Sequence, residues 1–261
     1  MNFYNKKLER SRFGAGLLLN YDQAGDSQYT KTGVALNGSY TLQVTQRNFL
    51  TAGVQAGIGQ RGFSTEDLRF DSQFNGEAYD PTWSNKENFT NTNKIFPDLS
   101  AGLNWHYRSS NRTLLDIGAA IFHVNKPNKS FYENEDVNLA QRYSLYGMGT
   151  FMLAQKLDLF LQGTGQFQNT HEQIEVGGGI NLHLNTRPDN EVVLALAAFS
   201  RFRDEADAII PYLGLRYRMW NVGLSYDINL SEFQVATDGF GGPEMSISYI
   251  ITKVKPLKIK V

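Results

Sequence analysis

Apolar and polar residues alternate along most of this chain, and the alternation is nearly perfect towards its C-terminal end. Between 221 and 230 every second residue is apolar, namely Val222, Leu224, Tyr226, Ile228 and Leu230. Successive side chains of a β-strand point to opposite faces, so such a segment has one apolar and one polar face. About twelve segments show this period and none shows a convincing helical period, which predicts an all-β protein.

The predicted strands cover most of the chain. They are 12–21, 32–44, 49–61, 98–108, 113–124, 140–153, 157–161, 174–184, 192–198, 213–217, 221–230 and 245–251. The segments 113–124 and 140–153 alternate less regularly than the others.

The polar face of these strands separates two kinds of all-β protein. In a water-soluble sandwich or barrel that face is solvated and usually rich in Lys and Glu. Here it is rich in small or uncharged polar residues; in 49–61 it carries Thr51, Gly53, Gln55, Gly57 and Gly59. This composition is typical of the interior of a transmembrane barrel whose apolar face contacts lipid. We therefore predict an antiparallel transmembrane β-barrel.

The lengths of the connections between the predicted strands support this prediction. Every second connection is short: 45–48, 109–112, 154–156, 185–190 and 218–221. The remaining connections include the longest ones: 22–31, 64–97, 125–138, 169–171, 203–207 and 231–243. Outer-membrane barrels have short periplasmic turns and longer extracellular loops. Both chain ends, including the basic tail 253–261, are then expected on the periplasmic side.

Composition excludes several other classes of protein. The 261 residues carry a formal net charge of -1, so no basic surface for nucleic acid is indicated. The chain has no cysteine, which rules out disulfides and iron–sulfur clusters. No apolar run approaches the roughly 18 residues of a membrane helix. The first residues also lack the apolar core of a signal peptide.

Local motifs give no anchor for catalysis, a cofactor or a metal. Gly57–Gly62 matches G-x-G-x-x-G, but no amphipathic helix follows it, so glycines in a crowded strand explain it better than a nucleotide site. The four histidines show no metal-binding spacing, and no G-x-S-x-G motif is present. We therefore predict that the protein is not an enzyme and binds no cofactor.

The long connection 64–97 is the segment most readily interpreted as functional. It is too long for a simple turn and is rich in aromatic residues, which a purely flexible loop would not need. It either caps the barrel or presents aromatic contact area to a partner protein. With two aromatic residues of the connection 125–138, the candidate docking residues are Phe70, Phe74, Tyr79, Trp83, Phe89, Phe96, Phe131 and Tyr132.

Five segments of the chain carry a family resemblance. They are FGAGLLLNYDQAGD at 13–26, FDSQFNG at 70–76 with Asp80-Pro81, DLSAGLNWHY at 98–107, FHVNKPN at 122–128 and WNVGLSYDIN at 220–229. With them the chain resembles the PorP/SprF family over nearly its whole length. The resemblance implies an outer-membrane β-barrel of the type IX secretion system of Bacteroidota. It further implies a role in secretion and surface attachment of adhesins and, in gliding species, in motility.

The chain departs from the family pattern at its beginning. Family members usually start with a signal peptide and at least one further strand pair before the segment at 13–26. The expectation is therefore a single outer-membrane barrel domain over 1–261 that lacks its signal peptide and first strands. An intact barrel of the family would then have about 14 strands, in keeping with the even strand numbers of such barrels.

Three functions are open at this point. The first is a docking component of the type IX secretion system, whose external loops hold an adhesin or another secretion subunit while the turns and basic tail face the rest of the apparatus. The second is a porin or a barrel that transports hydrophobic solutes. The third is a soluble all-β binding module.

Overall fold

A computed structural model describes residues 11–65, 68–87, 91–131, 137–187, 190–203, 205–230 and 241–251. Its strands are β1 (Ser11–Ala24), β2 (Tyr29–Gln43), β3 (Asn48–Gly62), β4 (Asn93–Arg108), β5 (Leu114–Phe122), β6 (Arg142–Ala154), β7 (Leu157–Gln168), β8 (His171–Asn185), β9 (Val192–Arg203), β10 (Glu205–Tyr217), β11 (Trp220–Tyr226), β12 (Ile228–Asn229) and β13 (Pro243–Tyr249). One 3-10 helix, η1 (Asp71–Gln73), lies between β3 and β4. Within these residues, no helix has the length and apolarity needed to cross a membrane.

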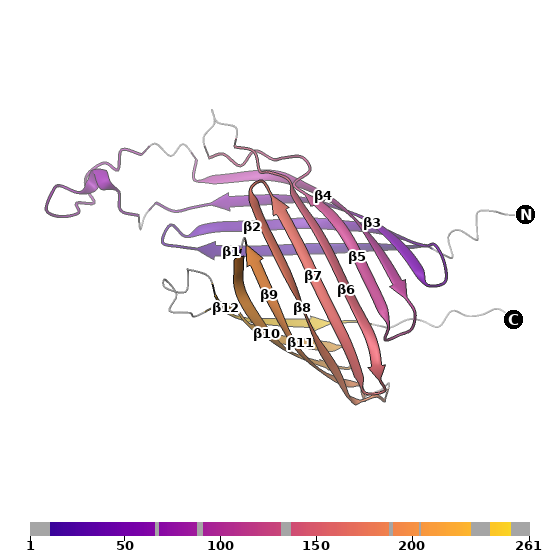
Figure 1. Cartoon of the computed structure of the whole chain (residues 1–261). Helices are drawn as coiled ribbons and strands as arrows, with labels where there is room; N and C mark the ends of the chain where they lie inside the picture. The colour runs from indigo at the N-terminus through magenta and orange to yellow at the C-terminus, as the bar shows by residue number, and fades with distance from the viewer. Residues whose placement is uncertain are drawn as a thin grey trace, which may run out of the picture. The chain divides into compact units, whose positions relative to one another are not determined.

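The strands follow one another in the sheet in their order along the chain, from β1 to β13 (Figure 1). The two-residue strand β12 pairs with β10 outside this order. The pairings from β1 to β3 and from β7 to β11, together with that of β11 and β13, are antiparallel. The predicted all-β antiparallel fold with about twelve strands is therefore confirmed.

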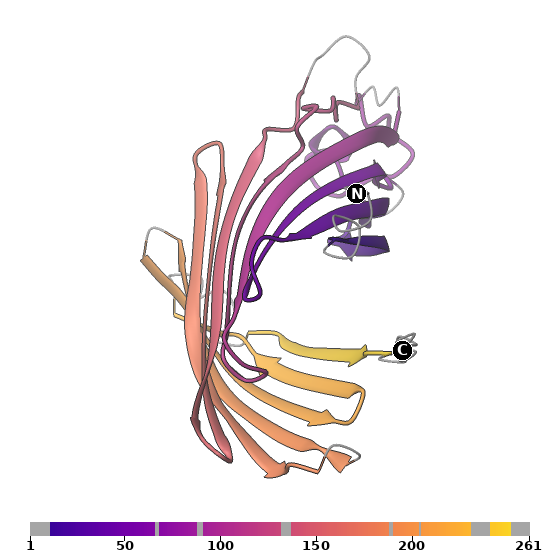
Figure 2. The same ribbon diagram turned by 90° about the vertical axis from the view of Figure 1, so that its right-hand side faces the viewer.

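The chain forms two compact units. The first comprises Met1–Thr45, Phe49–Asn104 and Ala119–Tyr143, and the second comprises Gln46–Asn48, Trp105–Gly118 and Ser144–Val261. In the first unit, β1 and β2 form a long hairpin whose register runs from Ser11 opposite Leu42 to Ala24 opposite Tyr29. In the second unit, the strands from β7 onwards lie side by side, drawn from orange to yellow in Figure 2.

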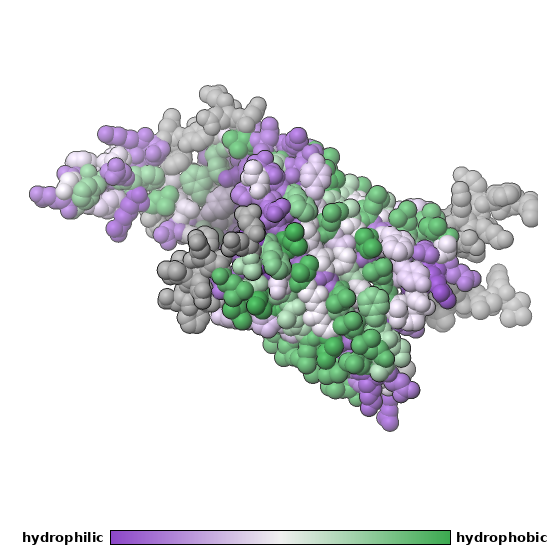
Figure 3. Space-filling model, in the orientation of Figure 1, coloured by the Kyte–Doolittle hydropathy of each residue, from purple (hydrophilic) through white to green (hydrophobic). Residues whose placement is uncertain are grey.

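The apolar face of the strands is exposed and the polar face is partly buried, which is the reverse of a soluble protein. In β3, Leu50, Val54 and Ile58 are 45%, 66% and 61% exposed, whereas the polar residues between them are half-buried. Only Val193 and Ala208 form a buried apolar core among the described residues. The buried polar side chains there are Gln73, Ser100, Ser130, Asp158 and His183. Figure 3 shows apolar residues gathered over the strands and hydrophilic ones at the strand ends.

Hydrogen bonds connect the polar residues on the less exposed face. In the first unit Gln55 Nε2 donates to Asn37 Oδ1 over 2.8 Å, and the hydroxyls of Thr41 and Thr51 lie 2.8 Å apart. Burying polar groups costs free energy unless they are hydrogen-bonded, and this face meets that requirement with its own side chains. The opposite face, which bears the large exposed apolar residues, is suited to lipid.

Two of the predicted long connections contain fewer residues than expected. The connection 22–31 shrinks to 25–28, because Asp22 pairs opposite Lys31 and Gln23 opposite Thr30 as the hairpin continues. A single residue, 204, separates β9 from β10. Backbone pairing does not require apolar side chains, so polar strand ends extend beyond the alternating pattern. The connection 63–92 remains long.

Candidate functional site

The connection between β3 and β4, residues 63–92, is closed at its base by backbone hydrogen bonds. The N–H of Phe63 donates to the carbonyl of Thr92 over 3.1 Å, and the N–H of Ser64 donates to the carbonyl of Ser27 over 2.7 Å. These bonds hold the two ends of the connection together beside the β1–β2 hairpin. The connection therefore starts from a defined position on the first unit.

Beyond its base, the connection folds on itself around Gln73. The Gln73 side chain, 8% exposed, accepts a hydrogen bond from the N–H of Phe70 at 3.2 Å and donates to the carbonyl of Trp83 at 3.0 Å. The backbone carbonyl of Gln73 accepts from the N–H of Asp80 at 2.8 Å. With its buried side-chain amide and its own carbonyl, Gln73 satisfies three backbone groups and ties η1 to the segment that follows it.

A second turn is held by Asp80. Its Oδ1 accepts hydrogen bonds from the hydroxyl of Thr82 at 2.6 Å and from the backbone N–H of Thr82 at 2.9 Å. The side-chain hydrogen bond and then the backbone bond lower the pKa of Asp80 below its ordinary value, because both favour the ionised carboxylate. Asn75 makes a similar local turn by accepting from the N–H groups of Glu77 and Ala78. The segment is thus an ordered loop.

Four predicted docking residues lie on this ordered segment. Phe74 and Trp83 are 53% and 49% exposed. Tyr79 pairs with Phe74 through an isolated β-bridge, and the guanidinium of Arg69 lies 5.1 Å from the Tyr79 ring centre. Phe70 is half-buried. Phe74, Tyr79 and Trp83 therefore lie on one hydrogen-bonded loop, with Phe74 and Tyr79 paired directly.

The other predicted docking residues have different positions. Phe96 lies in β4 and not in a loop, so the predicted end of the connection at residue 97 is wrong. The Phe96 ring covers Gly59, because a Cβ added at Gly59 would lie 2.7 Å from Cε2 of Phe96. Phe131 packs edge-on against Phe63 at 4.9 Å, with the Arg61 guanidinium 4.6 Å from its ring centre. Phe89 and Tyr132 lie outside the described residues, as does the basic tail.

A chain of ion pairs links the short turns of the second unit. Arg112, in the β4–β5 turn, donates to Asp158 at 2.7 and 3.0 Å, and it also reaches the carbonyls of Ala154 and Gln155 in the β6–β7 turn. His183 Nε2 lies 2.7 Å from Asp158 Oδ2. The side chains of Asp158 and His183 are 4% and 3% exposed.

The same chain continues to the next turns. His183 Nδ1 lies 3.6 Å from Glu191 Oε1, which accepts from Arg216 at 3.2 Å. Sequence reasoning missed this network, because its members are isolated polar residues at five places along the chain. The one available signal was that each of them stands at or near a predicted short turn.

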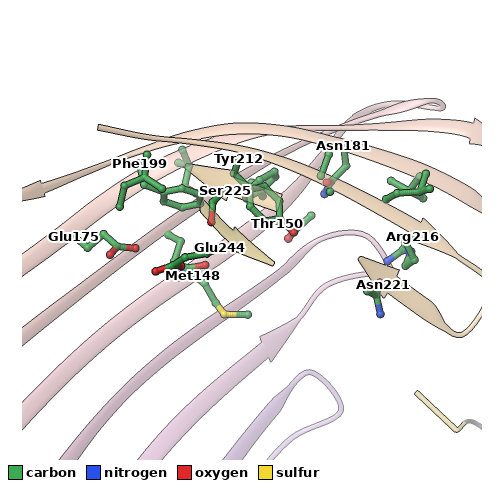
Figure 4. A pocket seen from close by; sticks show the side chains of 18 of the residues that line it. Met148, Thr150, Glu175, Asn181, Phe199, Tyr212, Arg216, Asn221, Ser225 and Glu244 are labelled. Carbon is green, nitrogen blue, oxygen red and sulfur yellow. The ribbon is translucent and has the colours of Figure 1, made fainter. Parts of the chain in front are cut away.

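A second polar cluster lies on the same unit and borders a cavity of about 560 Å³. Arg201 donates to Asp207 and to Asp227, both at 2.6 Å. The cavity, shown in Figure 4, is lined by acidic groups, amides and aromatic rings from β6 to β13. Phe199 and Tyr212 form its aromatic wall, with their ring centres 6.4 Å apart.

The described residues form neither a cluster of metal ligands nor a phosphate-binding glycine loop. Within the described ranges, no group of three or more potential metal ligands comes together. Gly57–Gly62 lies wholly inside β3, and the next described helix is the three-residue η1, which begins only at Asp71. A phosphate-binding glycine loop requires a helix N-terminus at that point. The glycines belong to a strand in which Gly57 has no room for a Cβ, since Ala35 of β2 would lie 2.7 Å away.

Residues 2–249 match the family described as type IX secretion system membrane protein PorP/SprF. The chain belongs to this family. The resemblance predicted from the five sequence segments is therefore confirmed, and this is a secretion-system membrane protein family, not an enzyme family. No curated protein matches the chain.

The PorP/SprF chain also matches a solved structure, an outer membrane channel from Pseudomonas putida F1. The match has 12% sequence identity and a TM-score of 0.42, and it covers 91% of this chain and 90% of the channel. Family membership and the lipid-suited face of an antiparallel sheet agree with the predicted transmembrane β-barrel of the outer membrane. Its partners are components of the type IX secretion system.

Proposed function

We propose that this PorP/SprF protein is a docking component that supports secretion or surface attachment of an adhesin, and gliding motility where it occurs. The main support for this proposal is the loop at 68–87. It combines two half-exposed aromatic side chains, Phe74 and Trp83, with a backbone held by the buried Gln73.

An ordered aromatic loop suits protein docking for an energetic reason. Large rings that are already fixed lose little conformational freedom on binding, and aromatic residues supply much of the energy of protein interfaces. The hydrogen bonds of Gln73 and Asp80 fix the backbone on either side of Phe74 and Trp83. The predicted partner is a secreted surface adhesin or another subunit of the secretion apparatus.

Replacing residues 68–87 with a Gly-Ser linker tests the proposal, because it keeps the base formed by Phe63 and Thr92. We expect the protein to insert normally while the amount of adhesin on the cell surface falls. A finer test is the pair of substitutions Phe74→Ala and Trp83→Ala, which should lower display at least about tenfold if these rings are interface anchors.

Tyr143→Ala is the matched control, since Tyr143 is an aromatic residue of β6 with a similar exposure of 52%. It should leave adhesin display unchanged. Unchanged display in the strain that carries the Gly-Ser linker, with normal membrane levels of the protein, would contradict docking by this loop. Conductance measurements in planar bilayers test the alternative of a porin: a steady open channel that the loop deletion does not alter would favour transport.

A further inference from the structure

We propose that the cavity on the polar face of the second unit is a binding site for an organic cation, an ammonium or guanidinium group carried on an apolar body. This site is separate from the docking loop and does not depend on the proposed function. The cavity favours such a ligand through its carboxylates, its surplus of negative charge and its aromatic wall.

Three acidic side chains line the cavity with acceptor oxygens that bind no donor among the residues that the structure describes. Among the described residues, Glu175 of β8 and Glu244 of β13 form no ion pair. Asp227 uses one oxygen for Arg201, while its other oxygen, Oδ1, is buried and accepts no hydrogen bond from the described residues. An unsatisfied buried acceptor is costly, so a donor supplied by a ligand would be favourable.

The charge around Arg201 is strongly unbalanced. Arg201 is paired with Asp207 and Asp227, and Glu175 stands opposite it in the register of β8 and β9. Together with Glu244, these four carboxylates lie by two guanidinium groups, because Nε of Arg203 is 3.7 Å from Asp207, which leaves a formal surplus of two negative charges. The other arginine of the lining, Arg216, is already paired with Glu191. A cation is therefore the ligand charge that this end of the cavity favours.

The walls of the cavity favour an organic cation over a metal ion. Phe199 and Tyr212 present their rings beside the acidic end, and Figure 4 shows Glu175 and Glu244 on the same side of these rings. Aromatic faces attract ammonium and guanidinium groups and also pack against an apolar body. The carboxylates are not gathered as metal ligands in the described part of the chain. The volume of about 560 Å³ is that of a small-molecule or side-chain site.

The opposite end of the cavity is different in character. Asn181 and Asn221 line it beside Arg216, away from Glu175 and Glu244 in Figure 4. Amides offer both donors and acceptors, so they suit an uncharged polar group such as a peptide bond. The cation has two possible sources, a free amine and a Lys or Arg side chain of a polypeptide, and the experiment separates them.

The test is isothermal titration calorimetry on the full chain in detergent, with two probes. The free probe is L-arginine amide, and the peptide probe is acetyl-Ala-Arg-Ala-amide. Binding of both probes would support a free ligand, and binding of the peptide alone would support a polypeptide source. Binding of neither, or equally tight binding of acetyl-Ala-Glu-Ala-amide, would overturn the proposal.

Variants locate the site. The double variant Glu175→Gln with Glu244→Gln keeps the side-chain shapes and should weaken binding at least about tenfold, since it removes two of the favourable charges. Glu172→Gln is the matched control, because Glu172 lies on the same strand but does not line the cavity. It should bind like the unmodified protein. Equal affinity in the double variant and the control would place binding elsewhere and refute the site.

A charge-reversal variant distinguishes loss of the binding site from loss of folding. Glu175→Lys should lower affinity for the arginine peptide and raise affinity for the glutamate peptide, because it replaces a negative charge in the cavity with a positive one. A variant that merely misfolded would lose both. Weaker binding of both peptides by a Glu175→Lys protein that is folded, by circular dichroism, would count against a charge-selective site.

Discussion

Removing the charge of Asp158 should destabilise the second unit by about 2 to 3 kcal/mol. The perturbation is Asp158→Asn, which keeps the size of the side chain and one carbonyl oxygen. Asp158 accepts from Arg112 at 2.7, 3.0 and 3.1 Å and lies 2.7 Å from His183. The substitution removes the ion pair while burying an amide in its place.

The magnitude follows from burial. The side chain of Asp158 is 4% exposed, and removing one partner of a buried ion pair commonly costs about 3 to 5 kcal/mol. Arg112 is 24% exposed and keeps its bonds to the carbonyls of Ala154 and Gln155, so part of that cost is avoided. The expected loss is therefore about 2 to 3 kcal/mol, below the usual cost of breaking a fully buried pair.

Equilibrium unfolding in urea, with the protein in lipid vesicles, measures the effect. Trp105 and Trp220 belong to the second unit and report its unfolding by fluorescence. The control is Glu191→Gln: Glu191 is 38% exposed and 3.6 Å from His183, so its loss should cost less than about 0.5 kcal/mol.

A double-mutant cycle with Arg112→Gln isolates the pair. We expect a coupling free energy of about 1.5 kcal/mol or more between Arg112 and Asp158, because each single change leaves the other charge unpaired. A coupling within about 0.5 kcal/mol of zero would refute the reasoning, since it would mean that water replaces the partner at no cost. In that case the network would be a solvated feature and not a link between turns.

The remaining predictions concern the two faces, the strand spacing and the loop. Leu161 of β7 is 50% exposed, and Leu161→Arg should destabilise the membrane-inserted protein by about 2 to 4 kcal/mol. Gln162→Arg, on the opposite face, should cost far less. Equal effects of the two substitutions in the unfolding assay would contradict a lipid-facing side. Gly179→Ala should lower stability by about 1 to 3 kcal/mol in the same assay, because its Cβ would meet backbone atoms of β9, and an unchanged urea midpoint would contradict this spacing. The hydroxyl and N–H of Thr82 lower the pKa of Asp80, so the loop should keep its protease resistance from pH 7 down to the unfolded value of 3.8 and lose it as the pH falls further through the folded pKa. Cleavage that already increases near pH 5 would argue against this role of Asp80.

The sequence by itself determined the secondary structure and the side of the sheet that meets lipid. A period of two is a local property, so residues such as Leu50, Val54 and Ile58 reveal their common face without any knowledge of the fold. The uncharged polar residues between them indicated which face avoids lipid. Strand ends were less well predicted, because Asp22 and Lys31 extend a hairpin by backbone pairing that the pattern does not record.

Only the tertiary structure decided which distant polar residues meet. Arg112, Asp158 and His183 come from three separate parts of the chain, and their contact depends on strand register and on the neighbours of each strand. The same holds for Glu175 and Glu244, which line one cavity although 69 positions separate them. Alternation fixes the face of a side chain, but a face extends across many strands, so the pairing of charges on it is a long-range property.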